Sequence, residues 1–141
     1  MDTLVYSVST FMIPINVAAI HGKYDLMNVY MGLTLTSWAH HGITHELSCL
    51  KRDECKTVYN VIDLVMCRVA VAYTLWYAVL FTSRLQFFVY FVSLMSVVFS
   101  YYGYVTHNRL YYIRGLENWR LHKAHIIMHL STCVGFTAIV L

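Results

Sequence analysis

The sequence is poor in charged residues, in proline and in glycine. Only 12% of its 141 residues are charged, whereas an ordinary soluble domain devotes about a quarter of its residues to charge. One proline and six glycines leave no Pro/Gly/Ser-rich linker, so we expect a single domain over residues 1–141. The composition therefore excludes an ordinary soluble protein, and no nucleic-acid partner is expected.

CxxC spacing is absent as well. The four cysteines are Cys49, Cys55, Cys67 and Cys133. Because the first two fall in a loop that we expect in the reducing cytosol, free thiols are predicted. A disulfide between Cys49 and Cys55 becomes plausible only if the chain has the opposite orientation.

Long apolar runs are abundant. Hydrophobic residues make up 59% of the chain, and the mean hydropathy is +0.56. Five stretches approach the roughly 20 residues that cross a bilayer as a helix: residues 4–20, 26–45, 57–82, 85–104 and 125–141. The first lacks the basic start of a secretory signal and is interrupted by Pro14, so we expect it to be retained. The sequence predicts an all-α, polytopic transmembrane bundle of about five helices, with the lipid bilayer as its environment.

Basic residues indicate the orientation, since Lys and Arg favour cytoplasmic loops. The connections between helices 2 and 3 and between helices 4 and 5 carry Lys51, Arg52, Lys56, Arg109, Arg114, Arg120 and Lys123. The other side carries Lys23 and Arg84. We therefore expect a cytosolic N-terminus.

Ionisable side chains within the apolar runs gather near three helix ends. Histidines close the second helix, Asp63 lies near the start of the third, and further histidines open the fifth. Because successive helices alternate in direction, these three ends lie on one side of the bilayer. Such residues are costly in a membrane and usually face a cavity, a partner or a metal.

The spacing of these residues favours a metal site. His125 and His129 are four residues apart and share a helical face, as do Ser37 and His41. Three histidines from two helices leave one zinc position open for water, as in catalytic zinc sites. We predict His41, His125 and His129 as Zn²⁺ ligands, with Ser37 and Asp63 as catalytic acid/base or orienting groups. His40 is expected to point away from this face and to be passive.

Two structural alternatives remain open at this point. An HxxxH pair also serves for hydrogen bonding between membrane helices. Asp63 has an alternative partner in Arg68, although a spacing of five residues is poor for an ion pair on one helix.

The motifs TSWAHHG, VIDLVM and AHIIMHLST resemble the signature of the CREST superfamily. This superfamily includes alkaline ceramidases, adiponectin and progestin receptors, and myomaker-like proteins. The resemblance implies a seven-helix membrane fold, here shortened by two helices. It also implies zinc held by His41, His125 and His129, with Ser37 and Asp63 supporting the zinc-bound water.

Three functions follow as hypotheses. The first is a zinc-dependent hydrolase that cleaves an amide or ester bond of a membrane lipid. The second is a non-enzymatic protein, myomaker-like or receptor-like, with a structural zinc. The third is a haem or di-iron protein, although a di-iron hydroxylase needs more histidines on one side than the chain supplies. Because two helices are missing, either a homo-oligomer closes the site or the site opens sideways to lipid.

Overall fold

The computed structural model describes residues 3–49, 53–114 and 119–141, with side chains over 6–42, 58–103, 105–106 and 123–141. The regular secondary structure of these residues is helical throughout, with short turns between helices, which confirms the all-α prediction for the described part of the chain. The elements are α1 (Thr3–Ser9), α2 (Met12–Ile20), α3 (Tyr24–Cys49), α4 (Asp53–Phe81), α5 (Arg84–Arg114) and α6 (Trp119–Val140).

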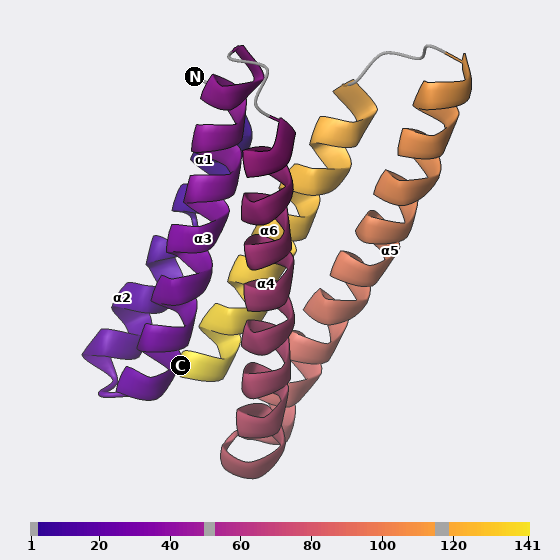
Figure 1. Cartoon of the computed structure of the whole chain (residues 1–141). Coiled ribbons are helices and arrows are strands. Elements are labelled where there is room, and N and C mark those ends of the chain that lie inside the picture. The colour runs from indigo at the N-terminus through magenta and orange to yellow at the C-terminus, as the bar shows by residue number, and fades with distance from the viewer. Residues whose placement is uncertain (1–2, 50–52, 115–118) are drawn as a thin grey trace.

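The helices lie roughly along a common axis, and successive passes of the chain alternate in direction (Figure 1). Helices α1 and α2 follow one another as a single broken helix, so the elements make five passes through the bundle. The second half of α3, the first half of α4 and the first half of α6 therefore lie at the same end, as the alternation of helix direction predicts.

The first helix breaks at Thr10 and Phe11, and Pro14 explains the break. Proline has no N–H to donate to the carbonyl four residues earlier, which here is that of Thr10. The backbone tightens instead, so that Ile13 N donates to the Thr10 carbonyl at 3.0 Å and Phe11 N to that of Val8 at 3.0 Å. Such a tight turn inside a membrane helix is tolerated where protein buries it.

A short turn reverses the chain between α2 and α3. Gly22 has a φ of 67°, the left-handed conformation that a glycine adopts at little cost. Its N–H donates to Ala19 and that of Lys23 to Ala18, at 3.1 and 2.8 Å. This pair of bonds satisfies the last carbonyls of α2 and sends α3 back alongside it.

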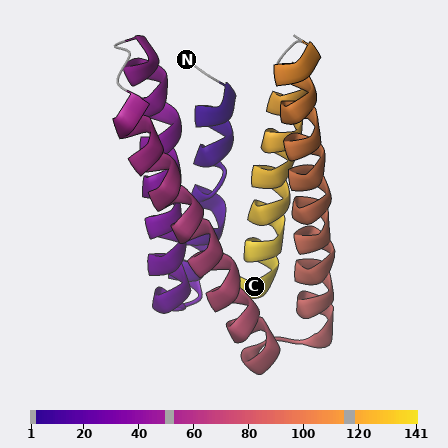
Figure 2. The ribbon, with the colours of Figure 1, turned by 45° about the vertical axis from the view of Figure 1, so that its right-hand side comes forward.

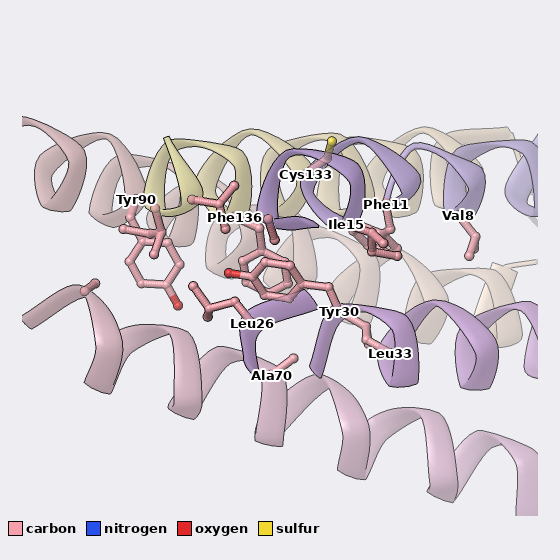
Figure 3. Packing of buried hydrophobic residues seen from close by; sticks show 14 residues of the cluster. Val8, Phe11, Ile15, Leu26, Tyr30, Leu33, Ala70, Tyr90, Cys133 and Phe136 are labelled. Atoms are coloured by element: carbon pink, nitrogen blue, oxygen red, sulfur yellow. The ribbon is translucent and has the colours of Figure 1, made fainter. Parts of the chain in front are cut away.

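Aromatic packing joins α3 to α6 in the core (Figure 3). The ring of Tyr30 stacks on that of Phe136, with centroids 4.3 Å apart, and Tyr30 is hydrogen-bonded to Thr74 of α4 at 3.2 Å. Between α5 and α6 the contact is closer, since a Cβ added at Gly135 would lie 2.9 Å from that of Ser93. Small residues of this kind let membrane helices approach closely.

Helices α4 and α5 are joined at Thr82 and Ser83 but diverge from there toward the other end of the bundle (Figure 2). Helix α4 packs mainly on α3, and α5 packs mainly on α6. The bundle is consequently less closed between α4 and α5 than elsewhere.

Three helices in the described part of the chain are long and apolar enough to span a membrane: Val58–Phe81, Arg84–Gly103 and Lys123–Val140. The segment Tyr6–Ile20 is apolar but shorter. Helix α3 is not among the three, because the polar side chains along it lower its hydropathy. This part of the structure supports a membrane protein.

The helices extend further than their apolar runs. Helix α5 continues ten residues beyond the predicted end at 104, and α6 begins six residues before the predicted start at 125. Cys67 and Cys133 are free thiols as predicted. The side chains of Cys49 and Cys55 lie outside the described part. So do those of the basic residues on the predicted cytosolic side, with the exception of Lys123.

Candidate metal centre

Three histidines meet at one end of the bundle. His41 comes from α3, and His125 and His129 come from α6, and one ring nitrogen of each lies within 4.8 Å of those of the other two. The ring centroids of His41 lie 4.9 Å from His125 and 5.5 Å from His129. The histidines predicted as zinc ligands are therefore the ones that the structure brings together.

Helix geometry accounts for this meeting. His125 and His129 are one turn apart on α6, with ring centroids at 4.7 Å. His41 approaches from the far end of α3, which runs in the opposite direction to α6 (Figure 1). The distances are those of a group that could hold a metal ion.

Ser37 and Asp63 form a second polar pair beside the histidines. The side chain of Ser37, one turn before His41, is a hydrogen-bond partner of the Asp63 carboxyl group. Both are buried, with exposed fractions of 2% and 8%. The Cys67 thiol, one turn further along α4, lies 4.0 Å from Oδ1 of Asp63. The two predicted catalytic residues are thus adjacent, on facing helices.

The expectation that His40 points away is wrong. Its ring centroid lies 4.7 Å from that of His41, and its ring nitrogen joins those of His41 and Asp63 in a second group within 4.8 Å. The reason is that α3 has neighbours on two sides, α4 and the broken first helix. Consecutive residues, about 100° apart around a helix, can therefore both face protein.

Two residues of the broken first helix also reach the centre, and the sequence did not single them out. Ser7 Oγ lies 2.7 Å from Nδ1 of His129. The ring of Phe11 meets that of His129 edge to face, with centroids 5.5 Å apart. A serine within an apolar run gave a weak signal, because its polar neighbours at helical spacing, Thr3 and Thr10, are neither metal ligands nor acids.

A cavity of about 190 Å³ lies against the centre. His125, His129, Ser37 and Asp63 contribute to its wall, and the rest of the wall is mostly apolar. Leu64 of α4 and Tyr101 of α5 line it while remaining exposed at 41% and 51%. Exposed residues of both α4 and α5 thus form part of its wall, on the side where these two helices diverge (Figure 2).

Comparison with known proteins finds no relative of this chain. No protein-family model matches the chain, and neither does any curated protein or solved structure. The resemblance to the CREST superfamily stays a prediction.

The donor set is suited to a transition metal. Imidazole nitrogens are good ligands for zinc and for other late first-row metals, and three of them leave a position for water or substrate. His129 is buried, with an exposed fraction of 8%. Burying a polar ring nitrogen without a partner is costly, and a bound cation would give the nitrogen that partner. The arrangement can hold a metal ion beside a carboxyl group and an apolar cavity.

Proposed function

We propose that the protein is a multi-pass membrane hydrolase that uses zinc to cleave an amide or ester bond of a membrane lipid. The observation that carries this proposal is the meeting of His41, His125 and His129 beside the buried Ser37–Asp63 pair. A purely structural tie between helices needs the histidines but gives no reason for a buried carboxyl group facing the same cavity.

The cavity supports a lipid as substrate. Its wall is mostly apolar and includes exposed residues of α4 and α5, which fits an opening between these two diverging helices. An acyl chain in the bilayer would enter by that route without leaving the hydrocarbon. A sideways opening also makes closure by a homo-oligomer unnecessary for this function.

The residues have separate tasks in this proposal. His41, His125 and His129 would hold the cation, which would supply a Lewis acid for polarising the scissile carbonyl group. Asp63 takes the proton from the attacking water and delivers it to the leaving group, as a general acid–base residue does. Ser37, hydrogen-bonded to Asp63, fixes the direction of the carboxyl group.

The orientation follows the charge distribution. With Lys and Arg gathered on one side of the sequence-predicted helices, the N-terminus is cytosolic. The histidine end of the bundle then faces the cytosolic leaflet.

A second function is favoured by one observation. Helices α3 and α6, which supply the three histidines, pack on α2 more closely than on one another. A cation between them would add, at the histidine end, a second direct link between α3 and α6 beside the Tyr30–Phe136 stack. This is the task of a structural zinc in a non-enzymatic membrane protein.

One experiment separates these functions. The purified protein and its His125→Ala variant are compared for metal content by elemental analysis and for hydrolysis of amide- and ester-linked lipids in vesicles. We expect about one zinc per chain and metal-dependent turnover, both lost in His125→Ala and both kept in His21→Ala, where the histidine is exposed far from the centre. Zinc without turnover supports the structural function. Hydrolysis that persists without metal contradicts the proposal, and iron with a visible absorption band indicates redox chemistry.

A further inference from the structure

The broken first helix delivers one hydroxyl group to the metal centre. Ser7 is 7% exposed, lies two residues before the end of α1, and places Oγ at 2.7 Å from Nδ1 of His129. A contact of this length between two buried polar atoms, 122 positions apart in the sequence, lies within the distance range of a hydrogen bond.

The proton in this bond can lie on either side, with opposite consequences for the centre. If Ser7 donates to Nδ1, the neutral imidazole carries its proton on Nε2, and that nitrogen has no lone pair for a cation. If Nδ1–H donates to Ser7, the Nε2 lone pair is available. Metal-binding histidines almost always donate their second N–H to an oxygen atom in this way.

We propose that Ser7 is a positioning residue that accepts a hydrogen bond from Nδ1–H of His129 and so selects the tautomer whose Nε2 can bind a cation. The inference rests on the proposed metal centre and extends it from α3 and α6 to the first helix.

The helix break holds Ser7 in place for this task. The backbone N–H and the hydroxyl group of Thr10 both donate to the Ser7 carbonyl, at 3.3 and 2.6 Å. These bonds fix the last turn of α1, from which Oγ reaches α6. In a continuous helix the backbone donor to this carbonyl would be Phe11, four residues on.

The break is itself attached to α6 one turn beyond His129. The Cys133 thiol donates to the carbonyl of Thr10 at 3.2 Å, the carbonyl that Pro14 leaves without its usual helical donor. His129 and Cys133 are four residues apart and share a face of α6. Helix α6 is thus bonded to the break at two successive turns, so that the Ser7 hydroxyl and the His129 ring have little freedom to separate.

Nuclear magnetic resonance of the metal-free protein, labelled with ¹⁵N-histidine, tests the inference directly. We expect the His129 proton on Nδ1 in the unmodified chain, a shift of population toward Nε2–H in Ser7→Ala, and restoration in Ser7→Thr, which keeps the hydroxyl group. Ser9→Ala, an exposed serine on the same helix, leaves the tautomer unchanged. A proton on Nε2 in the unmodified chain overturns the inference even if Ser7→Ala fails to fold.

Zinc affinity, measured by competition with a chelator, gives the second readout. Loss of such an outer hydrogen bond costs about 10- to 100-fold in metal affinity, so we expect that loss in Ser7→Ala and recovery in Ser7→Thr. Equal affinity in Ser7→Ala and the unmodified chain overturns the inference while the metal centre stands. Absence of zinc from the unmodified chain overturns the proposed function instead, and the tautomer then remains a separate measurement.

Discussion

The ring of Tyr30 lies almost parallel to that of Phe136, with 7° between their planes and 4.3 Å between their centroids (Figure 3). The stack joins α3 to α6, the two helices that carry the three histidines of the centre. Phe136 also lines the cavity beside that centre. The stack therefore sets the spacing of the two helices on which the proposed ligands are placed.

Phe136→Ala should destabilise the bundle because it removes this stack and leaves a hole between α3 and α6. Replacing a buried phenylalanine by alanine typically costs about 3–5 kcal/mol, which unfolding in detergent or bicelles would measure. Phe99→Ala is the matched control, since Phe99 is 73% exposed. Equal stability of the two variants would contradict the role assigned to the stack.

Gly135→Ala should push α5 and α6 apart. The added Cβ would meet Cβ of Ser93 at 2.9 Å, and overpacking of this kind costs about 1–3 kcal/mol. Gly103→Ala is its control, because nothing lies within 4 Å of a Cβ at that position. A thermal unfolding temperature that falls only in Gly135→Ala confirms the close approach, and an equal response refutes it.

Asp63→Asn distinguishes a proton carrier from a ligand. In the proposed mechanism the variant keeps its zinc, while lipid turnover falls by about 10²- to 10⁴-fold because general acid–base catalysis is lost. Asp25→Asn, at an exposed position early in α3, keeps both. If zinc content falls together with turnover, Asp63 is a ligand, as its grouping with His40 and His41 permits.

Pro14→Ala should weaken the hold of the first helix on α6. Alanine restores an N–H that can donate to the Thr10 carbonyl and compete with the Cys133 thiol for it. We expect Ser7 to lose its place beside His129 and zinc affinity to fall by about tenfold. Chelator competition measures the change, and unaltered affinity would show that Ser7 is held independently of the break.

Lys23 should contribute a pH-dependent term at the opposite end of the bundle. Burial lowers the pKa of its ammonium group, although Nζ also donates to the Ile139 carbonyl at 3.2 Å. A folded pKa below the unfolded one means that the unfolded chain binds more protons in the interval between them, so stability rises with pH there. Unfolding of the unmodified chain and Lys23→Gln between pH 8 and the ordinary lysine pKa of about 10.4 should show this rise only in the former. A rise of equal size in both would assign it to other groups.

The sequence was sufficient to place His41, His125 and His129 together. Alternation of helix direction put their helix ends on one side, and the spacing of four put two of them on one face. Counting depth from the helix ends also put Asp63 level with His41, and the structure brings these two side chains into one group.

It was not sufficient where contacts depend on how neighbouring helices surround one another. His40 was misplaced because the sequence does not indicate that α3 has protein on two sides. Ser7 was missed because the path of the first helix depends on a break that Pro14 permits but does not locate. Helix α5 exceeded its apolar run because a helix can continue into polar sequence once packing holds its start.

Because α4 and α5 are joined at Thr82 and Ser83, a small change in the angle between the two helices moves their distant ends by a larger amount. Asp63 lies 20 residues from Ser83 along α4, roughly 30 Å at 1.5 Å per residue. A change of about 5° in the angle between the two helices thus displaces the far end by roughly 2.6 Å, from the same helix rise. Since membrane helices adjust their tilt to bilayer thickness, the thickness of the surrounding membrane bears directly on how wide the cavity stands open.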